Sequence, residues 1–289
     1  MSKDIMKGVK VAIFKEGEVK VGDVSMHYAT SGKGRPLLFV HGWTNNWKGY
    51  IPMAQYLYKD YQFIGVDLPG FGDSDRLDSY NLKSQADYLA GFINEMKIKK
   101  PVVVGHSMGA YVVSTFYSRH PNVASHIILI APMFLKNNKT AMVKVMGVMY
   151  RLLRKSKLAM SAVKRIVDTK RYTYFTAKHI NMYKFDKKII DETGFEGKLK
   201  ASKEVYVDMG MAISKTHIDD LIEKNTIPVD LIFGKFDKLT NATQARKLLD
   251  GRGKYNIEEV DEAGHVLTVE QPEETVKRLV KLIGPSGRS

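Results

Sequence analysis

Short runs of apolar residues, each bounded by glycine, proline or polar turn residues, recur along the chain. Such runs predict strands that are buried on both faces of a sheet. They cover residues 37–40, 63–66, 102–104, 127–130 and 227–233, and a final strand is expected at residues 257–260. Ahead of them, short segments separated by Gly17 and Gly22 predict an antiparallel start to the sheet, at residues 9–14, 18–21 and 24–30.

Segments with helical spacing lie between these runs. Residues 81–96 carry apolar side chains at positions 82, 86, 89, 93 and 96, which is the spacing of one helix face. We also expect helices at residues 50–58, 110–119 and 271–283. Strands that alternate with helices predict an α/β fold, with a mostly parallel twisted sheet and helices on both faces.

Length and composition set limits on the kind of protein. The chain has 289 residues, enough for one α/β domain or for a domain with an insertion. It has no cysteine, which excludes disulfides, thiolate metal sites and a cysteine nucleophile. The apolar run at residues 11–14 is too short for a signal-peptide core, and no run approaches the roughly 18 apolar residues of a membrane span. We therefore expect a cytoplasmic protein.

The formal net charge of +14 raises the question of a nucleic-acid partner. Residues 136–200 hold 17 Lys and Arg against 5 Asp and Glu, so most of the excess lies in one segment. This segment has neither a zinc-finger spacing nor a glycine-aromatic RNA-binding signature. A charge excess alone has low specificity, so we do not expect nucleic acid as a partner.

The strand at residues 102–104 runs directly into Gly105-His106-Ser107-Met108-Gly109, and a helix follows. Glycines two residues before and after Ser107 are what a sharp, strained strand-to-helix turn requires, because neighbouring chains pass too close for a side chain. Such a turn exposes the hydroxyl above the sheet. It also aims the N–H of Met108, at the start of the helix, toward a negative oxygen that forms beside the serine. Ser107 is therefore a candidate nucleophile.

The strand at residues 37–40 runs into a polar loop that contains Gly42, Trp43 and Trp47. In one interpretation Gly42 makes a tight turn and both tryptophans pack on the core. In another, the backbone N–H of Trp43 is the second donor of an oxyanion hole, because ester chemistry needs two donors that converge on one oxygen. The two interpretations are compatible, because the donor is a backbone N–H and the indole remains free to pack.

A third loop, Asp67 to Ser74, is rich in glycine but has no phosphate-binding signature. We expect its Asp67 and Asp73, and the nearby Asp75, to cap turns rather than to bind a metal. Taken in order, the His41-Gly42 loop, this loop and the Ser107 motif resemble the α/β-hydrolase superfamily. The resemblance covers about residues 20–132 and 227–284, and it is to the branch that holds small carboxylesterases, lipases, carbon–carbon-bond hydrolases and epoxide hydrolases.

The resemblance implies a hydrolase core at residues 1–132 and 227–289, with a helical cap, or lid, inserted at residues 133–226. Near the start of this cap Met142, Met146, Met149 and Leu153 follow helical spacing, while basic residues occupy other faces. In one interpretation the methionines of this helix pack on the core and its lysines face water. Alternatively, its basic face meets an anionic membrane surface, or an anionic substrate.

A serine nucleophile needs a histidine base and an acidic residue that orients it. Asp237 follows the strand at residues 227–233 and matches the acid position of the family, whereas Asp230 precedes the apolar run and is the weaker candidate. His265 lies in a loop after the last strand and resembles the family's base. His41 and His106 have structural places in their motifs, and the other five histidines have no motif. The order Ser107, Asp237, His265 is that of this fold.

We therefore expect a serine hydrolase, a carboxylesterase or lipase, that cleaves carboxylic esters through an acyl-enzyme without a metal or organic cofactor. Epoxide hydrolases of this superfamily use an aspartate where this chain has Ser107, which favours acyl transfer. Carbon–carbon-bond hydrolysis and perhydrolysis use the same residues and stay open. A non-catalytic small-molecule receptor or scaffold of the same fold is the alternative outside enzymes. The expected partner is a small-molecule ester, with peripheral membrane contact as a further hypothesis; the pattern leaves acyl length and oligomeric state undetermined.

Overall fold

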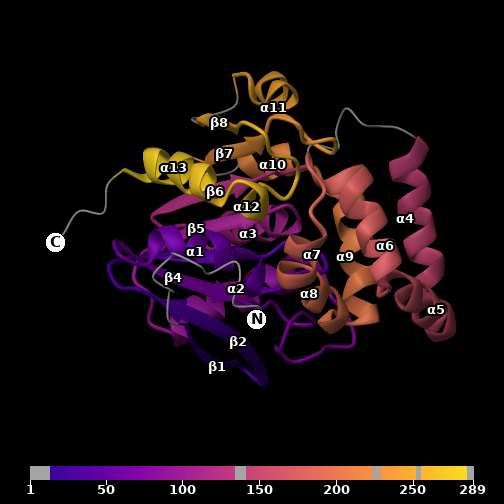
Figure 1. Ribbon diagram of the computed structural model, residues 1–289. Coiled ribbons are helices and arrows are strands. Elements are labelled where there is room, and N and C mark those ends of the chain that lie inside the picture. The colour runs from indigo at the N-terminus through magenta and orange to yellow at the C-terminus, as the bar shows by residue number, and fades with distance from the viewer. Residues whose placement is uncertain (1–13, 134–140, 224–226, 228, 252–254, 285–289) are drawn as a thin grey trace.

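An eight-stranded sheet forms the centre of the molecule (Figure 1). The computed structural model describes residues 14–133, 141–223, 227, 229–251 and 255–284, and side chains from residue 145 onward in the helix that begins at 141. The strand order is β1-β2-β4-β3-β5-β6-β7-β8. The strands are β1 Lys15–Val21, β2 Val24–Ser31, β3 Arg35–Val40, β4 Tyr61–Val66, β5 Val102–His106, β6 His126–Ile130, β7 Val229–Gly234 and β8 Ile257–Val260.

Strand direction agrees with the pattern of the sequence. β1 and β2 pair antiparallel, as do β2 and β4, whereas all pairs from β4 to β8 are parallel. The predicted mostly parallel sheet with an antiparallel start is therefore confirmed. The strand expected at residues 9–14 lies, apart from Phe14, outside the described residues.

Alternate side chains of the central strands enter two different cores, one on each face of the sheet. On β3, Leu38 and Val40 pack with α2 (Leu82–Glu95) and α3 (Met108–Arg119), while Leu37 and Phe39 pack with α1 (Ile51–Leu57) and α13 (Pro272–Ile283). A strand that is apolar at every position fits this layer order, since both of its faces are covered. α11 (Ala242–Leu249) and α10 (Ile218–Glu223) join α2 and α3.

Local signals explain where the core helices begin. Asn81 precedes α2, and its side chain accepts the N–H of Ser84 at 3.0 Å in a capping box. The helix predicted at residues 50–58 is α1, which has Pro52 in its first turn and is preceded by a 3₁₀ turn, η1 (Trp47–Tyr50). Proline is tolerated there because the first N–H groups of a helix have no partner within it.

A group of helices from the segment predicted as a cap lies beside the core, on the right in Figure 1. They are α4 (Ala141–Arg154), α5 (Lys157–Val167), α6 (Lys170–Thr176), the π-helix η2 (Ala177–Asn181), α7 (Lys187–Thr193), α8 (Phe195–Lys200) and α9 (Lys203–Lys215). Ser156, Thr169, Asp186 and Ser202 each cap one of these helices with a side-chain oxygen. None of the described helices is both long and apolar enough to cross a membrane.

These helices attach to the core at the loops that follow its parallel strands. The N–H of Ser202 donates to the carbonyl of Gly70, after β4, at 2.9 Å. A Cβ on Gly197 of α8 would lie 2.9 Å from backbone atoms of Asn45, after β3. Helix α8 and the start of α9 therefore contact loops at the edge of the sheet where open α/β sheets bind ligands.

The buried face of α4 differs from the expected stripe. Met146, Tyr150 and Leu153 pack inward against α5 and α9, whereas Met149 is 44% exposed and the Met142 side chain lies outside the description. Tyr150 takes the inner position because Gly210 of α9 leaves room for its ring: a Cβ there would lie 2.7 Å from it.

Candidate active site

Ser107 occupies the turn between β5 and α3 with a strained backbone. Its φ of 52° and ψ of −111° are unfavourable for a residue with a Cβ. Its N–H donates to the carbonyl of Ile130 at 2.9 Å, and its carbonyl accepts the N–H of Ala110 at 3.0 Å, so both neighbouring elements hold the turn. A Cβ on Gly105 would lie 2.5 Å from the Gly109 carbonyl oxygen, and one on Gly109 would lie 2.2 Å from that of Val40. Only glycine fits at either position.

A chain of hydrogen bonds joins Ser107, His265 and Asp237, which lie far apart in the sequence. The Ser107 Oγ is 2.9 Å from His265 Nε2, and His265 Nδ1 is 2.8 Å from Asp237 Oδ2. All three residues are buried. Because a carboxylate only accepts, it holds the imidazole proton on Nδ1 and leaves Nε2 to accept the serine proton.

Backbone donors fix the carboxylate of Asp237. Its second oxygen, Oδ1, accepts the N–H groups of Leu239 at 2.7 Å and Thr240 at 3.2 Å. The strand end of β7 therefore presents the Oδ2 atom to His265. Asp230, at the other end of β7, accepts instead from Asn256 and contacts His126 at 2.7 Å, away from this site.

The loop that carries His265 is held from three sides, by groups for which the sequence predicted no contact with this loop. The ring N–H of His106 donates to the His265 carbonyl at 2.8 Å. The carbonyl of Asn181, at the end of η2, accepts the His265 N–H at 2.7 Å. The carboxylate of Glu270 accepts the N–H groups of Gly264 at 2.8 Å and Tyr183 at 2.7 Å. Two of these three supports involve the segment predicted as a cap.

Burial determines the protonation of these supporting groups. Burial, with the neighbouring His265, lowers the pKa of His106 to about 4, so its ring is neutral and donates through Nε2. Burial also raises the pKa of Glu270, while the N–H groups of Gly264 and Tyr183 act in the opposite direction. The only signal in the sequence for His106 was its place beside Ser107, and Glu270 had no motif around it.

The turn after β3 is shaped by His41 and His106. His41 Nε2 accepts the N–H of Leu68 at 3.1 Å and Nδ1 donates to the Gly42 carbonyl at 2.9 Å, while burial lowers the pKa of His41. A Cβ on Gly42 would lie 2.9 Å from His106 Nδ1. No described residue accepts the backbone N–H of Trp43 or of Met108. Both of these N–H groups are therefore available to an oxygen from a ligand.

The indole of Trp43 connects this turn to the helices beside the core. It stacks on Tyr206 of α9, with ring centroids 4.7 Å apart and planes at 15°, and meets Tyr150 of α4 edge-on at 5.8 Å. Trp47 points the other way and is buried under β3 with Phe39. The position of the turn is thus coupled to α4 and α9.

Asp67 organises the glycine-rich loop after β4. One carboxylate oxygen accepts the N–H of Trp47 at 2.8 Å, and the other accepts that of Asp73 and contacts His27, both at 3.1 Å. His27, Asp67 and Asp73 are a group, among the described residues, whose donor atoms lie close enough to hold a metal ion. Asp67 already serves three donors and Asp73 pairs with Lys200, so we interpret the group as the support of a turn.

Comparisons with known proteins agree with this architecture. A family model described as alpha/beta hydrolase fold matches residues 35–272. The AB hydrolase superfamily protein YisY of Bacillus subtilis (strain 168) is 33% identical over 119 residues, which are 39% of this chain and 44% of YisY. The monoacylglycerol lipase ABHD6 of Bos taurus is 22% identical over 274 residues, 89% of this chain and 79% of that protein. The crystal structure of a putative lipase from Acinetobacter baumannii AYE has a TM-score of 0.77 at 20% identity, and the match covers 93% of this chain and 91% of that one.

Proposed function

This chain belongs to the α/β-hydrolase fold family, and we propose that it hydrolyses carboxylic esters with Ser107 as the nucleophile. The observation that carries the proposal is the continuous hydrogen-bonded chain from Ser107 Oγ through His265 to Asp237. A serine hydroxyl is a weak nucleophile unless a base takes its proton, and this arrangement supplies that base.

In the first half of the reaction, Ser107 Oγ attacks the ester carbonyl while His265 Nε2 accepts its proton. Asp237 compensates the positive charge that appears on the imidazole. The N–H groups of Trp43 and Met108 donate to the negative oxygen of the tetrahedral intermediate, each contributing about 3 kcal/mol to transition-state stabilisation. His265 then gives its proton to the leaving alcohol, and an acyl-enzyme ester remains on Ser107.

In the second half, water replaces the alcohol. His265 takes a proton from water, the resulting hydroxide attacks the acyl carbon, and the same N–H groups stabilise the second intermediate. Its collapse returns the proton to Ser107 Oγ and releases the carboxylic acid. No step needs a metal ion or an organic cofactor.

We further propose that residues 133–226 form a cap over this site. The contacts of Asn181 and Tyr183 with the His265 loop, and those of Tyr150 and Tyr206 with Trp43, support this role. The cap would exclude water and contact the acyl or alcohol group of the substrate. The named lipase relatives are in keeping with an ester substrate.

Hydrolysis of p-nitrophenyl esters of increasing acyl length tests the proposal. We expect turnover by the parent protein, and loss of at least about a thousandfold in kcat/KM for Ser107→Ala. Ser161→Ala, at an exposed serine of α5, is the matched control and should retain activity. If the folded parent turns over no ester, ester hydrolysis is wrong, and the carbon–carbon-bond cleavage of diketones and tight small-molecule binding become the leading hypotheses. The chain-length optimum distinguishes an esterase from a lipase.

A further inference from the structure

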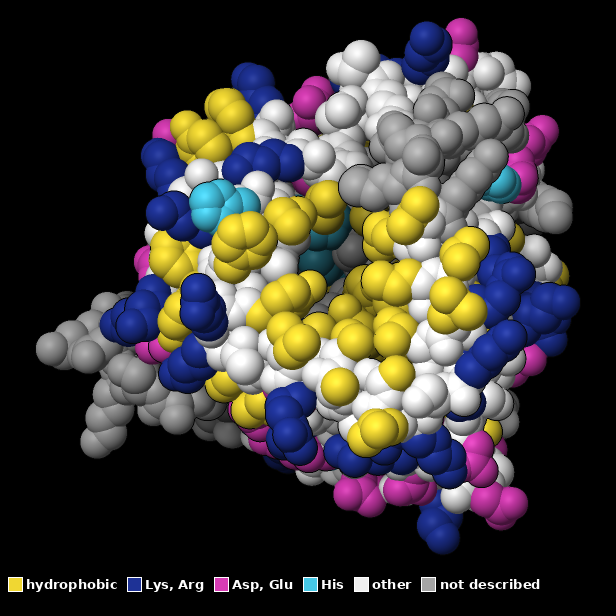
Figure 2. Space-filling model, turned by 90° about the vertical axis from the view of Figure 1, so that its right-hand side faces the viewer, with side chains coloured by type: hydrophobic (Ala, Val, Ile, Leu, Met, Phe, Trp, Pro, Cys, Tyr) yellow, Lys and Arg dark blue, Asp and Glu magenta, His cyan; other side chains and the backbone are white. Residues whose placement is uncertain are grey.

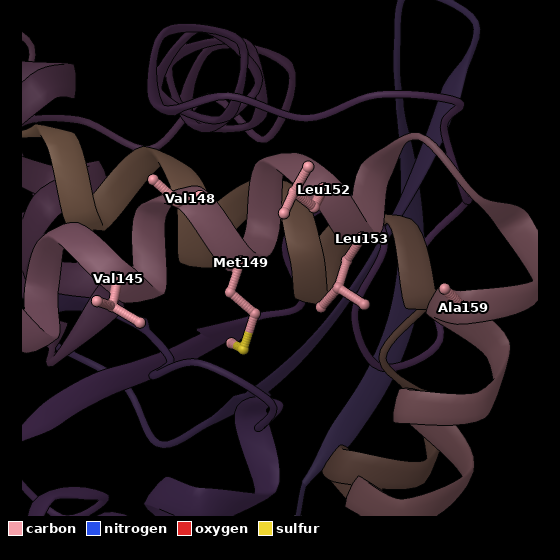
Figure 3. A pocket seen from close by; sticks show the side chains of 6 residues that line it. All are labelled: Val145, Val148, Met149, Leu152, Leu153 and Ala159. Carbon is pink, nitrogen blue, oxygen red and sulfur yellow. The ribbon is translucent and has the colours of Figure 1, made fainter.

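Helix α4 is apolar on the side that faces away from the protein as well as on its buried side. Its outer face, defined here as Val145, Val148, Met149 and Leu152, has side chains that are 63, 53, 44 and 60% exposed. Together with Leu153 and Ala159 they line a shallow apolar groove between α4 and α5 (Figure 3). A surface helix normally turns polar residues outward, so this face is typical of an interaction site.

Uncompensated positive charge lies beside the outer face of α4. Residues 141–181 hold ten Lys and Arg and a single acidic residue, Asp168. Arg154, Lys164 and Lys170 are used in ion pairs with aspartates. Within the part of the chain that the structure describes, six exposed cations between residues 145 and 181 have no ion pair: Arg151, Lys155, Lys157, Arg165, Arg171 and Lys178. Arg151, in the last turn of α4, and Lys155, in the turn directly after it, continue the helical spacing along one edge of the outer face.

The outer face of α4 belongs to the side of the molecule that Figure 2 shows. In Figure 2 hydrophobic side chains gather around a hollow on this side of the molecule, and Lys and Arg lie farther out. The buried side of α4 reaches the Trp43 turn through Tyr150. On the core side, Phe236 and Leu239, the exposed neighbours of Asp237, add apolar surface.

We propose that the outer face of α4, with its flanking cations, binds an anionic lipid bilayer. Apolar side chains that enter the acyl boundary, next to Lys and Arg at headgroup level, are the features by which a helix lies on such a membrane. A second copy of this chain fits the surface less well, because a two-fold contact would bring the same uncompensated cations together. Binding in this orientation places the hollow against the lipid.

Sedimentation with vesicles tests the proposal without any measurement of turnover, so its outcome is independent of the proposed ester hydrolysis. The full chain is mixed with vesicles of phosphatidylcholine, or of phosphatidylcholine with phosphatidylglycerol. We expect binding to the anionic vesicles to be at least about tenfold tighter, and to weaken as salt screens the charges. Absence of binding at low salt, or equal binding to both vesicle types, would overturn the proposal.

Two pairs of variants locate the surface. Arg151→Glu with Lys155→Glu should weaken binding to anionic vesicles at least about tenfold, whereas Lys15→Glu with Lys20→Glu, the same charge change on exposed β1, should not. Val148→Ser with Leu152→Ser should weaken binding by a similar factor, whereas Tyr56→Ser, at an exposed residue of α1, should not. Equal loss in both charge variants would mean a response to net charge alone and would contradict a local site. A dimer in sedimentation velocity that Val148→Ser with Leu152→Ser abolishes, without vesicle binding, would make this face a subunit interface instead.

Discussion

The backbone of Ser107 has φ and ψ angles that are unfavourable for a residue with a side chain. The cost in stability should be measurable. Ser107→Ala and Ser107→Gly both remove the hydroxyl, but glycine tolerates a φ of 52° and a ψ of −111°. We expect Ser107→Gly to have a free energy of unfolding about 1 kcal/mol higher than Ser107→Ala, since strain of this kind costs about 1–3 kcal/mol. Urea denaturation of the two variants checks this. Equal stabilities would show that the turn is unstrained.

A second residue-scale prediction concerns His106 and pH. Its pKa is about 4 in the folded protein, against an ordinary value of 6.5. As pH falls below 6.5 the unfolded chain takes up the proton first, so stability that is complete above pH 6.5 is lost progressively toward pH 4. The loss from this residue amounts to about 3 kcal/mol.

His106→Asn removes this titration. Urea unfolding at several pH values between 7 and 4 measures how much stability the parent and the variant each lose. The parent should lose about 3 kcal/mol more than the variant. The variant should lose less stability over this window, even if it is less stable at pH 7 because His265 loses a hydrogen-bond donor. Parallel curves for the two proteins would exclude His106 as the titrating group.

At the scale of elements, the junction between the predicted cap and the core lies at the His265 loop. Glu270, at the end of α12 (Leu267–Glu270), joins this loop to Tyr183 by accepting an N–H from each side. Glu270→Gln replaces one acceptor oxygen with an NH₂ group that faces an N–H, so the loop must shift. Because Glu270 acts through His265, we expect kcat to fall about tenfold, or about 1.4 kcal/mol, with little change in KM.

The matched control for this junction is Glu273→Gln, in the exposed first turn of α13. It should leave both kinetic constants near those of the parent. An unchanged kcat in Glu270→Gln, or a change confined to KM, would contradict a role in positioning His265. Circular dichroism of both variants separates a shifted loop from an unfolded protein.

At the scale of the whole molecule, the sequence predicted those parts whose causes are local. Each central strand is a short apolar run, and α2 has both its periodic stripe and its capping asparagine. The order of strands and helices along the chain, and their packing in layers, were therefore predictable. The order of the three loops around Gly42, Asp67 and Ser107 indicated the family. The sharp turns could be predicted from their glycines, because only a residue without a Cβ fits where two backbone segments pass this close.

Features set by contacts between distant segments had no such signal. The stacking of Trp43 on Tyr206 joins residues that are far apart in the sequence, and neither lies in a pattern that indicates the other. The same holds for Asn181 and Glu270 at the His265 loop. Helical spacing alone placed Met149 with Met146, but the room left by Gly210 turned Tyr150 inward instead.

The central claim is that Ser107 is a nucleophile activated by His265, and covalent labelling tests it most directly. A fluorophosphonate transfers its phosphonyl group to an activated serine oxygen with release of fluoride, and mass spectrometry of the digested protein locates the adduct. We predict one adduct, on the peptide that contains Ser107, and labelling at least about a thousandfold slower in His265→Ala. An adduct on a different residue, or equally fast labelling without His265, would contradict the account.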